Sequence, residues 1–217
     1  MSSPEFRSGL ILFLGLIISV GLHEFGHAVS AHLLGDPTPE SQGRVTLNPL
    51  AHMDPIGTLL FPILFIFVFK TGMLFGWGKP VQINPFRFNR KFSMRTGDII
   101  VSLAGPAMNI LLALLFTIVL AVSIKTGGSI SGIFAQAMMN YIILNLVLAF
   151  FNLIPLPPLD GSHILINMMG PKQQHIVDFI EQYGLFILIG IMATGFLDVL
   201  FKPVMSLGIW LIKLAVV

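Results

Sequence analysis

The chain has 217 residues, of which 55% are hydrophobic and only 10% are charged, with a net charge of +2. Soluble domains carry about a quarter charged residues, so this composition excludes an ordinary soluble protein and indicates an integral protein of the lipid bilayer. The absence of cysteine excludes disulfides and a zinc site built on thiolates. The basic residues concentrate in one short run, residues 70–95, which suits a juxtamembrane loop better than nucleic-acid binding.

Apolar segments predict membrane helices along most of the chain. They cover residues 9–34, 58–75, 98–124, 133–151 and 184–201. The tail, residues 203–217, is shorter than the about 20 residues that a spanning helix needs. We therefore expect an all-α polytopic membrane protein with about five to six membrane segments and short extended stretches at the interface. We expect residues 1–217 to form a single membrane-embedded domain.

The first apolar segment contains ionisable groups. It reads SVGLHEFGHAVSAHLLG, with His23, Glu24 and His27 near its middle. Residues four apart share one face of a helix, so both imidazoles can hold one metal ion, and Glu24 can reach water held there. This H-E-x-x-H pattern supplies two zinc ligands and a general base. Ionisable groups inside a membrane are costly and usually functional, so we favour a metal site over a solvated polar face.

A catalytic zinc ion needs a third protein ligand. Asp160 lies in FNLIPLPPLDGSH, where prolines break the backbone just after a predicted helix. Irregular backbone at membrane depth occurs where protein buries it or where it lines a watery cavity, so Asp160 is the strongest candidate. The other candidate ligands are His32, His52, Asp54, Asp98, His163, His175, Asp178 and Asp198.

Three motifs together resemble one protein family. HEFGH lies in one predicted helix, AGPAMN (residues 104–109) opens a second, and FNLIPLPPLDG follows a third. In this order, over residues 9–167, they resemble the site-2 protease family of intramembrane zinc metalloproteases. GRVTLNPLAHMDPIGT and GWGKPVQINP also look like segments of a short prokaryotic branch of that family, without a PDZ or CBS domain.

The resemblance implies a zinc metalloendopeptidase that cuts a transmembrane protein or peptide in or near its membrane segment, as in regulated intramembrane proteolysis. It implies that His23, His27 and Asp160 bind Zn2+. It also implies that Glu24 is the catalytic base and that Asn152 helps to position an unwound substrate.

The expected mechanism follows from these roles. Glu24 takes a proton from zinc-activated water, the water attacks the scissile carbonyl, and Glu24 returns the proton to the leaving amine. A substrate helix must be unwound locally before its carbonyl is exposed. An extended stretch near residues 44–48 or 79–84 could hold the unwound chain by strand addition.

The site also constrains the topology. Ligands from two helices must lie at one depth, so residues 36–55 and 76–97 should lie on the same side of the membrane, and their basic residues predict the cytoplasmic side. Residues 58–75 should then re-enter, or residues 76–97 should dip back; an ordinary spanning helix is the alternative. The expected location is a prokaryotic cell (inner) membrane, with the active site toward the cytoplasm.

Other polar residues have two interpretations each. His52 and Asp54 could form a gate or an accessory metal contact, or they could cap the surrounding loop. Asn109 could bond an unwound substrate backbone, or it could join helices, as we expect for Asn145. His163 could donate a hydrogen bond to Asp160, or it could cap a helix at the interface.

Two further functions fit part of the pattern. A membrane metal-binding or transport protein would use His23, His27 and Asp160 but would not need Glu24. A catalytically silent scaffold for membrane helices would need none of the four, and their joint presence argues against it. The sequence defines neither the substrate nor the oligomeric state.

Overall fold

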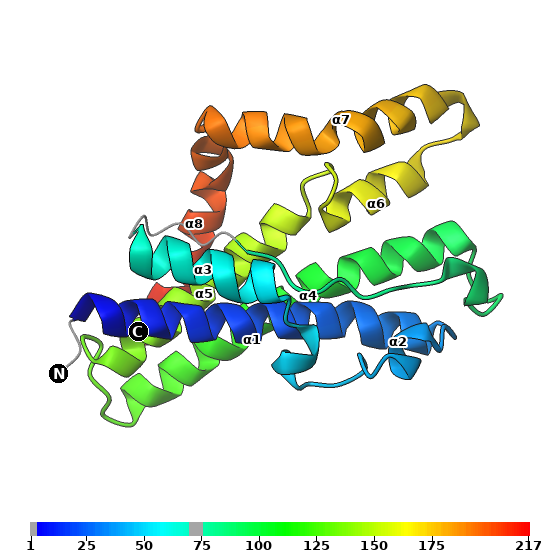
Figure 1. Ribbon diagram of the computed structural model, residues 1–217. Helices are drawn as coiled ribbons and strands as arrows, with labels where there is room; N and C mark the ends of the chain where they lie inside the picture. The colour runs from blue at the N-terminus through cyan, green and yellow to red at the C-terminus, as the bar shows by residue number, and fades with distance from the viewer. Residues whose placement is uncertain (1–3, 70–75) are drawn as a thin grey trace.

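The computed structural model describes residues 4–69 and 76–217, and no β-strand occurs among them. Short 3-10 turns lie at Pro49–His52, Pro85–Arg87 and Pro171–Gln173. The short helix Phe61–Ile63 continues on both sides as π-helical turns, so that the whole apolar helix covers Pro55–Val68. The helices are α1 (Pro4–Leu33), α2 (Thr38–Ser41), α3 (Phe61–Ile63), α4 (Met94–Lys125), α5 (Ile133–Asn152), α6 (Asp160–Met168), α7 (Gln174–Ala193) and α8 (Phe196–Val216) (Figure 1).

The predicted all-α membrane architecture is confirmed. In the described part of the chain, five helices are long and apolar enough to cross a bilayer, and Pro55–Val68 is a shorter apolar helix. The five are Glu5–Leu33, Met94–Lys125, Ile133–Asn152, Pro171–Ala193 and Phe196–Val216. The chain is therefore a multi-pass membrane protein.

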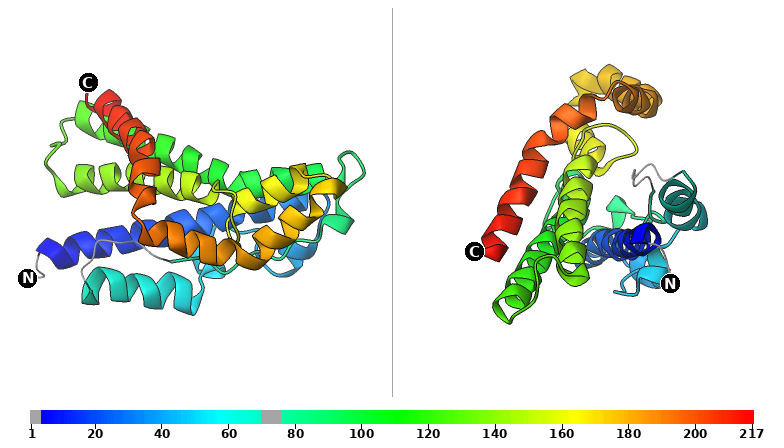
Figure 2. Two further views of the ribbon diagram at one scale, coloured as in Figure 1. Left: turned by 90° about the horizontal axis from the view of Figure 1, so that it is seen from above. Right: turned by 90° about the vertical axis from the view of Figure 1, so that its left-hand side faces the viewer.

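The core of the bundle lies where α8 covers α4 and α5 (Figure 2). Ile142 and Leu120 are fully buried there. Small side chains surround them, including Ala113, Ala135 and Ala215. Lipid tails are as apolar as these residues, so close packing rather than a hydrophobic driving force holds membrane helices together. The small residues allow that close approach.

The predicted helix boundaries are wrong near the C-terminus. The apolar pattern predicted one helix over residues 184–201 and a short tail, whereas the structure has two long helices, α7 and α8. Gly195 separates them with a left-handed backbone (φ 71°), which glycine adopts without steric cost. Pro203 lies inside α8 instead of ending a helix.

The segment after α2 folds back along α1. Gly57 and Trp77 meet through a backbone hydrogen bond of 3.2 Å, so the chain between them leaves and returns to one place. The helix around α3 lies beside the first half of α1 (Figure 1), where the ring of Phe67 packs against those of Phe6 and Phe13. Re-entry of residues 58–75 stays a prediction, and Lys70, used in it, lies outside the described residues.

The return path is an extended segment along the second half of α1. The Lys79 backbone N–H donates to the His52 carbonyl (2.8 Å), and the Asn89 N–H donates to the Leu34 carbonyl (2.6 Å). Between these points, the Asn84 N–H donates to the Asp36 carboxylate (2.6 Å). The basic residues of this segment thus lie toward the C-terminal end of α1.

Candidate metal centre

Two glycines let α1 and α4 cross closely. A Cβ atom on Gly26 would lie 2.7 Å from the Ala104 carbonyl oxygen. A Cβ atom on Gly105 would lie 2.4 Å from Nε2 of His27 and 2.7 Å from Cε1 of His23. The glycine of the AGPAMN motif therefore leaves the space that the two imidazoles occupy.

His23, His27 and Asp160 come together although 133 residues separate the second and third. They are the group of potential metal ligands found in the described part of the chain, with ligand atoms within 4.8 Å of one another. The two Nε2 atoms are 3.1 Å apart. His23 Nε2 is 3.2 Å from one Asp160 carboxylate oxygen, and His27 Nε2 is 3.3 Å from the other.

Hydrogen bonds on the far side of each imidazole define which nitrogen carries the proton. His23 Nδ1 lies 2.6 Å from Asn109 Oδ1, and His27 Nδ1 lies 2.8 Å from the Val101 carbonyl oxygen. Both partners can only accept, so both Nδ1 atoms donate. The Nε2 atoms of the neutral rings then present lone pairs to one another and to the carboxylate, an arrangement that a metal cation between them would stabilise.

The donor set fits zinc. Two neutral imidazoles and one carboxylate are a standard ligand set for a catalytic zinc ion, which keeps a fourth position open. Ligand atoms about 2.0–2.2 Å from a tetrahedral ion are about 3.3 Å from one another, close to the observed separations. Both histidines are 7% exposed, so the site is largely shielded from its surroundings.

Helix α6 delivers Asp160 from its first turn. Gly161 packs so tightly against the Leu153 and Ile154 carbonyls that a side chain would collide with them. On the next turn, His163 Nδ1 lies 3.3 Å from an Asp98 oxygen, and Asn167 Nδ2 donates to the same oxygen (2.5 Å). These bonds attach α6 to α4.

The predicted interaction between His163 and Asp160 is not among these contacts, since the partner of His163 is Asp98. The hydrogen bond with Asp98 raises the pKa of His163. The structure thus shows His163 joining α6 to α4 through Asp98, which is neither of the two predicted roles.

Glu24 lies beside the extended segment. The Val81 backbone N–H donates to Glu24 Oε2 at 3.3 Å. A Cβ atom on Gly78 would lie 3.0 Å from Glu24 Cγ, so this glycine allows the segment to cross directly over the carboxylate. Glu24 is half-buried and keeps its side chain between this segment and α1.

The two predicted substrate-binding residues lie in different surroundings. Asn109 is fully buried and binds His23, as described. Asn152, at the end of α5, is half-buried and donates to the Leu148 carbonyl of its own helix (3.0 Å). Their roles toward a substrate stay predictions, although the observed contact of Asn109 favours the helix-joining interpretation.

The remaining candidate ligands lie elsewhere. His52 is buried, with Nε2 at 3.0 Å from the Thr46 carbonyl oxygen. Asp54 accepts hydrogen bonds from the Ile56 and Gly57 backbone, which is the predicted capping role. His32 lies 3.4 Å from Glu40 near the end of α1. None of these belongs to the group around His23.

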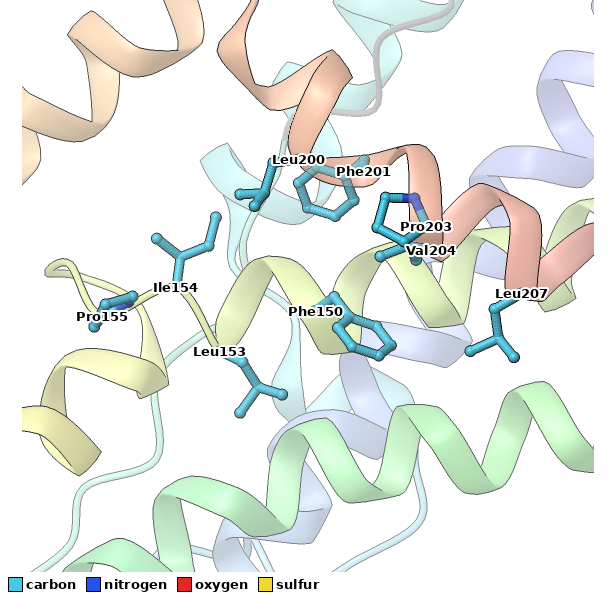
Figure 3. A pocket seen from close by; sticks show the side chains of 9 residues that line it. All are labelled: Phe150, Leu153, Ile154, Pro155, Leu200, Phe201, Pro203, Val204 and Leu207. Atoms are coloured by element: carbon cyan, nitrogen blue, oxygen red, sulfur yellow. The ribbon is translucent and has the colours of Figure 1, made fainter.

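An apolar cavity of about 570 Å³ lies between the end of α5 and α8 (Figure 3). Phe150 and Leu153 line one side, and Phe201 and Leu207 line the other. Leu153 precedes Asp160 by one short loop, but no candidate ligand lines the cavity. Its apolar lining suits contact with hydrocarbon rather than with the water that hydrolysis requires.

Comparison with known proteins defines the class as zinc metallopeptidases of the membrane. The model of Peptidase family M50 matches residues 121–192, which include Asn152 and Asp160. YwhC of Bacillus subtilis, named as a zinc metalloprotease, is 35% identical over 201 residues, which are 91% of this chain and 86% of YwhC. Rip2 of Mycolicibacterium smegmatis, named likewise, is 31% identical over 189 residues, which are 87% of this chain and 69% of Rip2.

The chain belongs to peptidase family M50, the site-2 protease family, and is a zinc metalloendopeptidase. The predicted family and the predicted Zn2+ cofactor are thereby confirmed. No solved structure matches the chain.

Proposed function

We propose that this protein cuts a peptide bond in or near a transmembrane segment of another membrane protein. The observation that supports this function best is the convergence of three ligand atoms, from α1 and α6, beside the Glu24 carboxylate. The convergence lies on a helix that is apolar enough to span the bilayer. We therefore propose that the substrate reaches the site from within the membrane.

In this proposal, His23, His27 and Asp160 hold Zn2+ through their Nε2 and carboxylate atoms. Zinc bound there supplies a Lewis acid that polarises the scissile carbonyl and lowers the pKa of water to about 7. Glu24 takes the proton of the attacking water and delivers it to the leaving amine. Asn109 orients His23, and Asn152 retains its proposed role beside an unwound substrate.

Substrate presentation is assigned to the extended segment over Glu24. The backbone N–H groups of Trp77, Lys79 and Val81 donate to the Gly57 carbonyl, the His52 carbonyl and the Glu24 carboxylate. Successive N–H groups of an extended chain point to opposite edges, so the N–H of Gln82 points away from that of Val81. The Asn84 N–H already donates to Asp36, so only the edge at Gln82 is assigned to the substrate. That edge can pair with an unwound substrate by strand addition.

The proposed location is a prokaryotic cell (inner) membrane, with the site toward the cytoplasm. Five basic residues between Lys79 and Arg95 lie along the segment that ends near the C-terminus of α1, and cytoplasmic loops carry such an excess. We also propose that residues 1–217 work as one membrane-embedded metalloprotease domain in regulated intramembrane proteolysis.

Zinc analysis of protein purified in detergent tests the ligand set. Wild type should hold about one zinc ion per chain, and Asp160→Ala should lose it. Asp178→Ala is the matched control, because Asp178 bonds Gln174 within α7, far along the chain from the site. Zinc held equally by wild type and Asp160→Ala would refute the proposed ligands and direct attention to His52 or His163.

Glu24→Gln separates proteolysis from metal storage or transport. Cleavage of a labelled single-span peptide in the same detergent should disappear, while zinc content stays at the wild-type level. A Glu24→Gln protein that cleaves as fast as wild type would exclude Glu24 as the general base.

A further inference from the structure

A chain of fully buried polar groups extends from His23 across three helices. Asn109 on α4 accepts from His23, and its Nδ2 donates to Asn145 Oδ1 on α5 (3.0 Å). Asn145 Nδ2 in turn donates to Ser19 Oγ on α1 (2.9 Å). Ser19, Asn109 and Asn145 are each 0–1% exposed. Nothing in the catalytic scheme above uses Asn145 or Ser19.

Two backbone carbonyls give this chain a fixed direction. Asn109 Nδ2 also donates to the Ser19 carbonyl (3.3 Å), and Asn145 Nδ2 also donates to the Tyr141 carbonyl (2.9 Å). A carbonyl can only accept, so each amide must turn its NH2 group toward it. With both amides held in this way, Asn109 has only its oxygen left for His23.

The orientation of Asn109 decides which nitrogen of His23 is free. An acceptor at Nδ1 stabilises the tautomer that is protonated there, and this tautomer leaves the Nε2 lone pair directed at Asp160 and His27. If the amide were reversed, its NH2 would face Nδ1 and would favour the opposite tautomer, with a proton pointing into the ligand cluster.

The second histidine does not depend on side chains in this manner. His27 Nδ1 donates to the Val101 carbonyl of α4, a backbone group that no substitution of Val101 removes. Substitution of neighbouring side chains should therefore change the tautomer of His23 rather than that of His27. Because the amides are fully buried, water cannot replace a lost partner without entering the core.

We propose that Asn145 is a positioning residue of the metal centre, which acts with Ser19 through Asn109 to present Nε2 of His23 to the metal. The inference rests on the proposed role of His23 as a zinc ligand. By this inference, α5 contributes to the zinc affinity of the site although it supplies no ligand.

To test the role of Asn145, the zinc dissociation constant of the full-length protein, purified in detergent, is measured by competition with a chelator. Asn109→Leu should weaken zinc binding by about 10–100-fold, the range found for groups that orient metal ligands. Asn145→Leu should weaken it by about tenfold. Asn109→Asp and Asn145→Asp should each bind zinc more tightly than the matching leucine variant, because each aspartate still offers the acceptor, but less tightly than wild type, because each loses its NH2 donor.

Tyr141→Phe is the matched structural control. The Tyr141 hydroxyl donates to the Ile11 carbonyl (2.8 Å) and so joins α5 to α1, yet the Tyr141 carbonyl that orients Asn145 is backbone. This variant loses a partly buried interhelical hydrogen bond but keeps the chain of hydrogen bonds to His23. It should bind zinc as wild type does, and the Co2+ absorption spectrum of its site should be unchanged.

The zinc affinities of these variants distinguish a wrong inference about Asn145 from a wrong proposed function. Equal zinc affinity of Asn145→Leu and wild type would overturn the inference, as would an equal loss in Asn145→Leu and Tyr141→Phe. If Asn145→Leu does not fold, equal affinities of Asn109→Leu and Asn109→Asp overturn it instead. A wild-type protein that holds no zinc, or that holds it equally after Asp160→Ala, refutes the proposed function itself.

Discussion

At the level of His23, buried polar side chains join α1, α4 and α5, whereas α8 packs on α4 and α5 through apolar side chains. Ser19, Asn109 and Asn145 carry the bonds in the first region. For the described residues from 174 onward, the side-chain hydrogen bonds join only close neighbours within a helix or its end. The ring contact between Phe151 and Phe201 is typical of the second region.

Apolar packing and buried hydrogen bonds constrain membrane helices to different degrees. Apolar packing tolerates small shifts of one helix along another, since lipid can replace a lost apolar neighbour. A buried hydrogen bond has no such replacement and fixes both distance and direction. We infer that the polar region preserves the geometry of the metal centre and that the apolar region chiefly completes the bundle.

The largest expected effect comes from adding one methyl group in each region. Gly105→Ala places a Cβ atom 2.4 Å from His27 Nε2 and should reduce zinc affinity by about 100-fold or more. Gly190→Ala, in α7, meets no heavy atom within 4 Å and should leave zinc binding unchanged. Zinc analysis of both variants checks this, and a Gly105→Ala protein with full zinc content would contradict the site geometry.

Proline substitutions along the extended segment should give a smaller effect. Val81→Pro removes the N–H that binds Glu24 and should lower kcat about tenfold. Gln82→Pro keeps that bond but removes a donor from the opposite edge, so it should mainly raise KM if a substrate strand pairs there. Both variants should retain zinc.

The control for these variants is Ile133→Pro. Ile133 is the first residue of α5, where proline is tolerated. Cleavage of the labelled peptide should be unaffected in it. Unchanged cleavage by Gln82→Pro would count against strand addition, and unchanged cleavage by Val81→Pro would count against a role of this segment in holding Glu24.

The sequence was most informative where chemistry restricts residue choice. His23 and His27 could be paired from their spacing alone, and Asp160 could be proposed because prolines interrupt an apolar region beside it. A pattern of residue types could not show that Asn109 binds His23, since that contact depends on how α1 crosses α4. Asn145 was predicted only as an interhelical bond, because its connection to the metal centre passes through two other side chains.

The boundary between α7 and α8 was missed for the opposite reason. Residues 185–201 are almost continuously apolar, so composition gave no sign of the turn at Gly195. Pro203 suggested a break, but neighbouring contacts allow a proline inside a membrane helix. Apolar regions of a membrane protein thus carry little information on helix ends, whereas polar motifs carry much.

The smallest expected effect concerns acid stability, and it compares the polar contacts at the end of α1 with the apolar C-terminal helices. Asp36 is fully buried and accepts from the Thr38 N–H (3.0 Å), the Thr38 hydroxyl (2.6 Å) and the Asn84 N–H (2.6 Å). Burial by itself would raise the pKa of Asp36, but these hydrogen bonds lower it below its ordinary value. Stability from Asp36 is therefore present above about pH 4 and is lost as pH falls through the lowered pKa.

Hydrogen exchange between pH 6 and pH 3, corrected for the intrinsic exchange rate, should show this loss locally. Protection around Asn84 should fall by up to about 1 kcal/mol, the amount that linkage allows at pH 3 for a single carboxyl with an ordinary pKa of about 3.9, while protection in α8 stays constant. Asp36→Asn should lower protection around Asn84 at pH 6 and remove its dependence on pH. A parallel fall in both regions would mean that acid loosens the whole bundle, and that polar bonds do not distinguish the end of α1 from the C-terminal helices.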